Sequence, residues 1–275
     1  MTARDRTTVG IRRRNLSGRV RQLVLAALGV GLVLVMWTLA AAATEPVRIP
    51  SPILVFEAIS QNLVEIRALE FASFGSGGII QNLTYTAVNV LMGVAAGAVA
   101  GFAIGLLIGR VRVMRNLLEP PLLFVGTVPV LVLLPFLSLW FGTARLATNG
   151  MVIFYTMVTV AVVTQQATTN VSNYYDNYAL SLGASSTRVL LQVVRPAVIP
   201  EVLGAVRVAL AFGWGFQAIA EVLGGQIGAG RVIRVYAQYA ATAEILSIVF
   251  SVGILAVVID GIVAGVGRWV VRWQE

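Results

Sequence analysis

The stretch that decides the fold runs from Tyr85 to Ile108 and reads YTAVNVLMGVAAGAVAGFAIGLLI. It carries no charged side chain, and it is longer than the roughly 20 apolar residues that a helix needs to cross the hydrocarbon core of a bilayer. Small residues recur along it every four positions, at Gly93, Gly97, Gly101 and Gly105. Such a ridge lets another helix approach closely. The stretch therefore predicts a membrane-spanning helix with a tightly packed neighbour, whose identity the pattern leaves open.

The composition of the whole chain agrees with this prediction. Of its 275 residues 58% are hydrophobic and only 12% are charged, and the mean hydropathy is +0.87, far above that of an ordinary soluble domain. We predict an all-α polytopic membrane protein with six spans, at about 20–43, 85–108, 117–140, 148–168, 198–223 and 245–266. The third span holds prolines that predict a broken helix or a re-entrant element: Pro120, Pro121, Pro129 and Pro135.

The order of these segments indicates a single transmembrane domain at 20–275, preceded by a basic cytoplasmic segment at 1–19. A loop at about 170–195 separates the fourth and fifth spans. The basic start, the apolar run after it and the small residues at 41–43 also imitate a cleavable signal peptide. Because the run from Leu23 to Ala43 is longer than the roughly 7 to 15 apolar residues of such a signal, we expect an uncleaved first span.

Arginine supplies all 20 basic residues of the chain, and the formal net charge is +8. With the N-terminus inside, 14 arginines fall at the inner ends of the spans, and the outer ends receive Arg48, Arg67, Arg145, Arg231 and Arg234. This asymmetry follows the positive-inside rule and predicts that both termini are cytoplasmic. The arginines lack the interleaved aromatic residues typical of RNA-binding surfaces, so we expect them to face anionic lipid and predict no nucleic-acid partner.

Three absent residue types limit the chemistry. Without cysteine or histidine, the chain lacks a thiolate, the commonest metal ligand and the commonest general base. Without lysine, it has no phosphate-binding P-loop. We therefore expect no catalytic residue, no metal site and no directly bound cofactor in this chain.

An amphipathic segment follows the first span. Ser51 and Pro52 are suited to the cap and first turn of a helix. The apolar residues that follow at mostly helical spacing are Ile53, Leu54, Phe56, Ile59, Leu63 and Ile66. We expect this helix to lie outside, along the membrane surface, where it packs over the bundle.

A more polar stretch, from Asn177 to Pro200, reads NYALSLGASSTRVLLQVVRPAVIP. It resembles the cytoplasmic coupling loop of ABC importer permeases, which reads roughly E-A-A-x-x-x-G with a Leu-Pro further on. The matching positions are Ala179, Gly183, Ala184 and Pro196. Asn177 stands where the family has Glu, so an ion pair made by that Glu is not carried over. Tyr178 replaces the family's first Ala, and Arg195 precedes the proline where Leu is usual.

Other segments extend the resemblance from about Ile49 to Trp273 and narrow it to importer permeases of the nitrate, sulfonate and taurine group. They are PSP at 50–52 with AI at 58–59, NLTYT at 82–86, GAVRVA at 204–209, AEVLG at 220–224 and GAG at 228–230. The resemblance implies a fold like that of type I ABC importer permeases. It also implies a permease subunit of an ATP-driven importer in a prokaryotic plasma (inner) membrane.

The same resemblance implies partners. We expect two cytoplasmic ATP-binding subunits, which hold ATP and Mg, a second permease copy or a paralogue, and an extracytoplasmic solute-binding protein. The solute is expected to be a small organic or inorganic anion such as a sulfonate, taurine or nitrate. Residues expected to couple to the ATPase are Asp176, Asn177, Tyr178, Ala179, Leu182, Gly183 and Ala184. In this loop we expect Asp176 or Asn173 to cap a short helix, and Gly183 to end it or to allow close approach to a partner backbone.

Polar residues at membrane depth are costly, so they are structural or functional. Candidates for the translocation path are Arg207, Trp214, Gln217 and Glu221. As structural alternatives, Arg207 pairs with Glu201 or a helix end, and Glu221 and Asp260 reach the membrane interface. The competing function is a secondary transporter or channel without an ATPase. It needs buried ion or proton sites, which the few acidic residues of the spans do not favour. An integral-membrane enzyme lacks any paired carboxylates or nucleophile triad.

Overall fold

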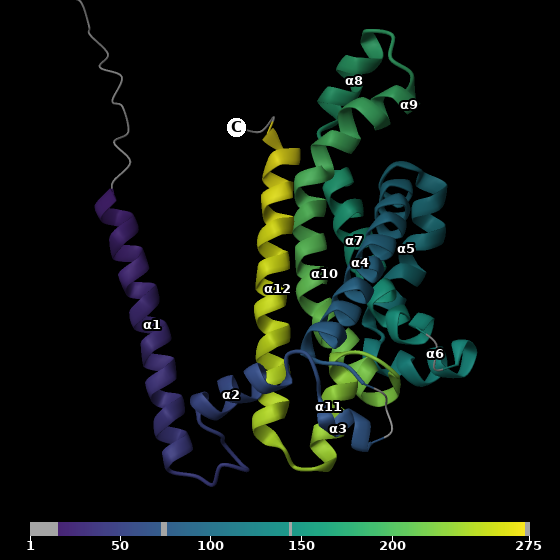
Figure 1. Ribbon diagram of the computed structural model, residues 1–275. Coiled ribbons are helices and arrows are strands. Elements are labelled where there is room, and N and C mark those ends of the chain that lie inside the picture. The colour runs from purple at the N-terminus through teal and green to yellow at the C-terminus, as the bar shows by residue number, and fades with distance from the viewer. Residues whose placement is uncertain (1–15, 73–75, 143–144, 273–275) are drawn as a thin grey trace, which may run out of the picture.

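The computed structural model describes residues 16–72, 76–142 and 145–272, which form helices, turns and loops (Figure 1). The predicted segment at 1–19 lies largely outside the described residues. The helices that form the long rods are α1 (Leu16–Ala42), α4 (Ile79–Arg110), α7 (Arg145–Asn170), α10 (Arg195–Gly224) and α12 (Thr242–Val270). The shorter helices are α2 (Pro52–Asn62), α3 (Arg67–Phe71), α5 (Arg112–Thr127), α6 (Leu133–Phe141), α8 (Asn173–Ser181), α9 (Ser186–Val189) and α11 (Ala229–Gln238). A 3₁₀ turn at Val130–Val132 precedes α6, and a π-helical turn at Leu190–Val194 joins α9 to α10.

The predicted spans are found, with longer helices than predicted. Five helical segments of the described chain are long and apolar enough to cross a membrane. The third predicted span is instead a pair of helices, α5 and the Val130–Phe141 segment, which meet at 86°. Pro129 stands directly before the second member, where a residue without an amide hydrogen and with fixed φ favours a break. The all-α, multi-span fold class is therefore confirmed, with the third span broken.

The long helices run side by side and separate two ends of the molecule (Figure 1). In Figure 1 α8, α9 and the C-terminal end of α12 lie at the top, while α2, α3 and α11 lie at the bottom. Helix α1 stands apart from the bundle and reaches it through α2 and through the Trp37 ring, which stacks on Phe250 of α12 at 5.2 Å between ring centroids.

The glycine ridge of α4 packs against α7. A Cβ at Gly97 would lie 2.5 Å from the carbonyl oxygen of Ile153, and one at Gly105 would lie 2.5 Å from that of Ala161. Real Cβ atoms do not approach backbone oxygens so closely, so only glycine lets the two backbones meet here. The predicted close helix approach is confirmed, and the neighbour that the sequence left open is α7 of the same chain.

Helix α2 begins at the predicted cap and buries its smaller apolar residues. The Ser51 hydroxyl accepts a hydrogen bond from the amide of Leu54 at 3.4 Å, and Pro52 occupies the first turn. The buried residues of this helix are Pro52, Val55 and Ala58, whereas Ile53 and Phe56 are exposed. The sequence did not predict which apolar residues of this helix face the bundle, and the surface position of the helix stays a prediction. In a membrane protein a lipid-facing surface can be as apolar as the core, so apolar spacing alone does not tell the two faces apart.

Candidate functional site

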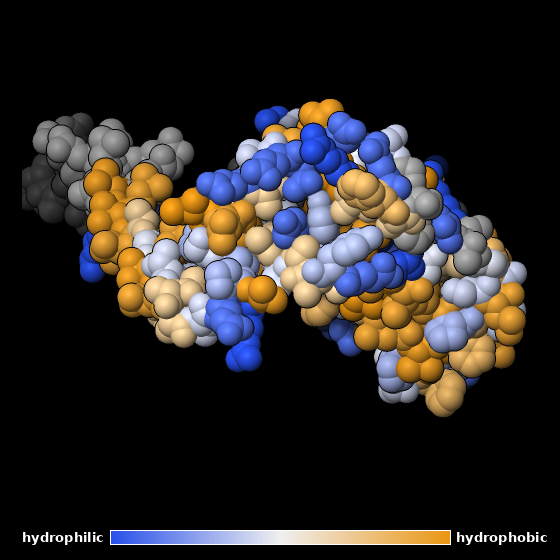
Figure 2. Space-filling model, turned by 60° about the horizontal axis from the view of Figure 1, so that its bottom comes forward, coloured by the Kyte–Doolittle hydropathy of each residue, from blue (hydrophilic) through white to orange (hydrophobic). Residues whose placement is uncertain are grey.

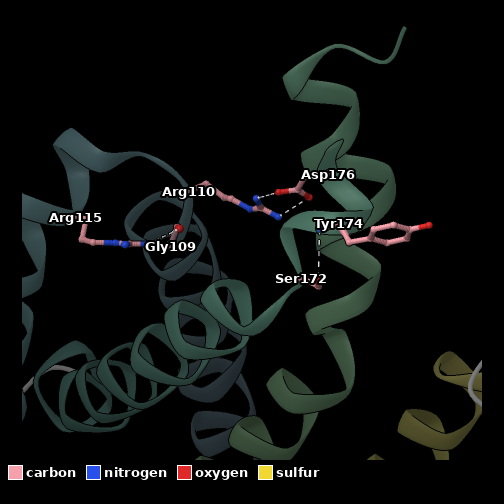
Figure 3. Close-up of polar contacts among 6 residues, drawn as sticks. All are labelled: Gly109, Arg110, Arg115, Ser172, Tyr174 and Asp176. Carbon is pink, nitrogen blue, oxygen red and sulfur yellow. Dashed lines mark hydrogen bonds and ion pairs between the residues drawn. The ribbon is translucent and has the colours of Figure 1, made fainter. Parts of the chain in front are cut away.

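Helix α8 is a short element that projects from the top end of the bundle (Figure 1). Ser172 caps it, because the Ser172 hydroxyl accepts a hydrogen bond from the amide of Tyr174 at 3.2 Å (Figure 3). The expectation that Asp176 or Asn173 caps this helix is wrong, since both lie inside it. Gly183 follows the helix with φ +83°, a left-handed conformation that glycine adopts without steric cost. Its expected role in ending the helix is confirmed.

The projecting element exposes a group of large apolar and aromatic side chains. Tyr174, Tyr178 and Leu182 are 69%, 58% and 71% exposed, and the Tyr174 and Tyr178 rings stack at 6.3 Å. Asn177 and Gly183 are also exposed, and a Cβ at Gly183 would meet no atom within 4 Å. Ala179 and Ala184 are half-buried and pack against the apolar cluster at the base of the loop. The loop thus has an outward face of rings around an open glycine and an inward face of small residues.

Asp176 belongs to neither of these faces. Its carboxylate turns toward the end of α4, where both terminal nitrogens of Arg110 donate to it (Figure 3). The Nη2–Oδ1 distance is 3.2 Å, and the two side chains are 23% and 14% exposed. Such a pair, which joins residues 66 positions apart, was not predicted.

At the opposite end, a buried carboxylate joins three helices. Glu221 of α10 accepts hydrogen bonds from the hydroxyl of Thr86 in α4 at 2.8 Å and from the side-chain amide of Gln217 at 2.9 Å. The amide of Gly230 in α11 donates to the same carboxylate at 3.0 Å. Glu221 and Gln217 have no exposed surface. The expectation that Glu221 reaches the membrane interface is therefore wrong, because its carboxylate is directed between α4 and α11.

The start of α11 is held by the same part of α4. The amide of Gly228 donates to Asn82 at 3.1 Å, and the amide of Ala229 donates to the Thr86 hydroxyl at 2.9 Å. Arg231 also donates to the Asn82 oxygen, at 3.2 Å. Burial lowers the pKa of Arg231 from its ordinary value and the charge of Arg234 lowers it further, while Glu221 raises it. These contacts bring together the NLTYT, AEVLG and GAG segments, which the sequence showed only as separate patterns.

The candidate path residues lie in different environments. Arg207 pairs with Asp260 of α12, with Nε–Oδ1 and Nη2–Oδ2 distances of 2.9 and 2.6 Å. The predicted alternative in which Arg207 pairs with Glu201 is wrong, since residues six apart on a helix point in different directions. Trp214 is buried between α4, α7 and α12 neighbours in one apolar cluster. A role of Arg207, Trp214, Gln217 or Glu221 in translocation stays a prediction.

The fold and the projecting loop can now be compared with known proteins. Residues 93–275 match the family described as binding-protein-dependent transport system inner membrane component. The chain belongs to this family. The matched region contains α8, the Arg207–Asp260 pair and the buried Glu221 cluster apart from its α4 residues Asn82 and Thr86.

Relatives match along nearly the whole chain. A probable ABC transporter permease protein of Brucella abortus (strain 2308) is 26% identical, over 94% of this chain and 98% of that one. The taurine transport system permease protein of Escherichia coli (strain K12) is 24% identical, over 88% and 86%. The bicarbonate transport system permease protein of Synechococcus elongatus is 26% identical, over 91% and 90%. The matches thus cover most of each of these relatives.

Solved structures share the fold. The inward-facing MetNI methionine ABC transporter matches with a TM-score of 0.58 at 17% identity, over 70% of this chain and 94% of that one. At this identity the likeness concerns the fold alone. The role rests on the family match and the relatives, which identify the chain as a multi-pass inner-membrane permease subunit of an ABC importer, a transport component and not an enzyme.

Proposed function

We propose that this permease moves a small organic or inorganic anion, and that α8 with the Gly183 turn is where a cytoplasmic ATP-binding subunit docks and drives the movement. The observation that carries the proposal is the exposed aromatic face of α8. Tyr174, Tyr178 and Leu182 stand out from the bundle around a glycine with open space beside it. Large aromatic residues with few rotatable bonds are typical anchors of protein interfaces.

The direction of the chain supports a cytoplasmic position for α8. Figure 1 shows the C-terminal end of α12 and the N-terminal end of α1 at the same end of the bundle as α8. This is the arrangement that the arginine distribution predicts for the inside. Since the chain has no lysine and therefore no P-loop, ATP and Mg belong on the partner, with two ATP-binding subunits for a pair of permeases.

The opposite end suits an extracytoplasmic solute-binding protein. Figure 2, which turns this end toward the viewer, shows blue hydrophilic residues gathered across it between orange apolar flanks. A hollow of about 530 Å³ is lined there by residues of α2, α3, α11 and α12 and of the turn after α2, namely Gln61, Asn62, Glu65, Arg67, Ala68, Tyr236 and Glu244. A polar end bounded by apolar sides is what a membrane protein presents to water and to a soluble partner.

The anionic class of the solute rests on relatives, two of which carry the names of taurine and bicarbonate systems. Arg207, which lies well inside its span, does not by itself supply a free cation for an anion. Its guanidinium is neutralised by Asp260 in the described conformation. We therefore assign selection of the solute mainly to the binding protein, and passage to the paired permeases.

Purification of the tagged chain from its native host in mild detergent, followed by mass spectrometry, tests the proposal. We expect an ATP-binding subunit in the purified complex, and uptake of taurine, bicarbonate or nitrate when the complex is reconstituted with its binding protein. Isolation of the chain without an ATP-binding subunit, under conditions that keep a control importer intact, would contradict it and favour a secondary transporter.

A further inference from the structure

The ion pair between Arg110 and Asp176 joins two elements that the chain itself connects only through α5, α6 and α7. Arg110 is the last residue of α4, and Asp176 lies in the middle of α8. Figure 3 shows the guanidinium and the carboxylate facing each other across the space between the helices. A two-nitrogen contact of an arginine with a carboxylate fixes orientation as well as distance. The pair therefore restricts rotation of α8 relative to α4.

The α4 side of this contact is itself firmly held. Arg115, at the start of α5, donates to the carbonyl oxygens of Ile108 and Gly109 at 3.3 and 2.8 Å (Figure 3). These carbonyls belong to the last turn of α4, which has no further helical partner for them. Gly109 also faces α7, since a Cβ there would lie 2.6 Å from the Cγ2 atom of Thr168. The end of α4 is thus tied to α5 and packed on α7.

Helix α8 is flanked by two breaks in helical geometry. Before α8 the chain leaves helical geometry at Val171 and Ser172, and after it the Gly183 turn has φ +83°. Between them, Ala179 of α8 is half-buried and packs against the cluster at the base of the loop, as does Ala184 directly after the turn. Small side chains at the base hold position less firmly than a directional, charged contact does.

We propose that Arg110 and Asp176 are positioning residues that join α8 to the α4–α7 pair, so that a displacement of α8 moves both spans together. This inference rests on the proposed role of α8 as the docking element. It also assigns Asp176 a task inside the chain. Although Asp176 adjoins Asn177, where the coupling loop of similar permeases has Glu, its carboxylate is engaged by Arg110 and is not offered to a partner.

A distance measurement between α4 and α8 tests the ion pair directly. Because the chain has no cysteine, nitroxide labels attach only at introduced cysteines, for which Leu107 and Ser181 are exposed positions on α4 and α8. Double electron–electron resonance is recorded for the full chain in lipid nanodiscs. The variants are Arg110→Gln, Asp176→Asn, the exchange of Arg110→Asp with Asp176→Arg, and Arg112→Gln as a control at a nearby exposed arginine.

We expect a narrow distance distribution in the unaltered chain and in the control, a broadened one in each single variant, and a narrow one again in the exchange. Equal widths in the single variants and the unaltered chain would overturn the inference. So would an exchange that stays as broad as the single variants, because restoring an opposite-charge pair at these two positions would then not restore the distance.

The assembled complex tests the consequence for transport. In complexes with the ATP-binding subunit, we expect the single variants to retain the bound subunit but to take up at least about fivefold less solute per ATP hydrolysed, with recovery in the exchange. The solute is whichever of taurine, bicarbonate and nitrate the unaltered complex takes up. Normal uptake in variants with broadened distances would overturn the inference. Absence of any bound ATP-binding subunit from the unaltered chain would instead contradict the proposed function of α8.

Discussion

The two ends of the helix bundle are built in different ways. At the α11 end, the buried carboxylate of Glu221 accepts hydrogen bonds from α4, α10 and α11, and no part of it is exposed. At the α8 end, the helix projects with exposed aromatic rings and is tied to α4 by the Arg110–Asp176 contact. One end is therefore fixed by contacts within the chain, while the other exposes the face that we propose a partner holds and moves.

The largest effect is expected from breaking the fixed end. Glu221→Ala leaves the buried Gln217 side-chain amide and the Gly230 amide without the carboxylate as acceptor, and each unsatisfied buried group costs about 1–3 kcal/mol. The Thr86 hydroxyl then keeps the Asn82 carbonyl oxygen as an acceptor, at 3.1 Å. We expect severe loss of folded protein, measured as the monodisperse fraction in detergent after a temperature series. Glu201→Ala, at an exposed position of the same helix, is the control. Equal stability of the two variants would contradict a structural role of the cluster.

A smaller loss of stability is expected in the region between the two ends, where α4 packs on α7. A side chain at Gly101 would overlap the carbonyl of Met157 and lie 3.0 Å from the amide nitrogen of Ala161. Overpacking of this kind costs about 1–3 kcal/mol, so Gly101→Val should lower the unfolding temperature. Gly253→Val, in α12 with no atom within 4 Å of its Cβ position, serves as the matched variant and should change it less. The reverse order would show that the ridge does not hold the helices together.

At the α8 end we expect a loss of binding without a loss of fold. Gly183→Arg places a large charged side chain in open space beside the exposed rings, so the protein should remain folded while the ATP-binding subunit binds at least about tenfold less. Gly183→Asn is the control for backbone strain, since Asn tolerates the left-handed conformation well. It distinguishes the effect of the arginine side chain from the effect of losing glycine. The amount of ATP-binding subunit recovered with each variant measures the effect. Recovery of the full amount of ATP-binding subunit with Gly183→Arg, together with normal transport, would contradict the docking role of α8.

The smallest effect overall is expected between the two ends, at Arg207. Arg207 and Asp260 neutralise each other within the spans, and their side chains are 46% and 40% exposed on the isolated chain, so the substitution removes less packed structure than Glu221→Ala does. If Arg207 lines the path, Arg207→Ala lowers uptake more than it lowers the yield of folded protein. The double variant Arg207→Ala with Asp260→Ala removes the carboxylate that the single variant leaves unpaired. Loss of folded protein in the single variant, reversed in the double one, would assign the pair a structural role.

The spans were predictable because their signal is local. Apolar length identifies each span, and the regular spacing of Gly93, Gly97, Gly101 and Gly105 identifies a close approach. The partner helix was not predictable, because small residues permit contact without specifying which surface fills the space. The broken third span was predictable as a class, since Pro129 disfavours continuous helix, but its 86° bend depends on what α5 and α6 pack against.

The site was predictable in its outline and not in its polar contacts. The projecting loop that carries α8 was found from a pattern of residues close together in sequence. The Arg110–Asp176 and Thr86–Glu221 contacts join residues 66 and 135 positions apart. Each partner alone resembles an ordinary charged or polar residue near a span end. A rule that buried charges need partners could have flagged Glu221, but not the choice of Thr86 and Gly230 as the donors.

Site-specific photo-cross-linking tests directly whether the ATP-binding subunit docks on α8. A photoreactive phenylalanine analogue is placed at Tyr178 in α8 and, as a control, at Phe71, an 83% exposed residue of α3 at the opposite end. Membranes of the native host are illuminated, and the products are identified by mass spectrometry. If the subunit docks on α8, we expect a cross-linked product with the ATP-binding subunit from position 178 and none from position 71. A product with that subunit from position 71, or from neither position while the complex remains assembled, would contradict it.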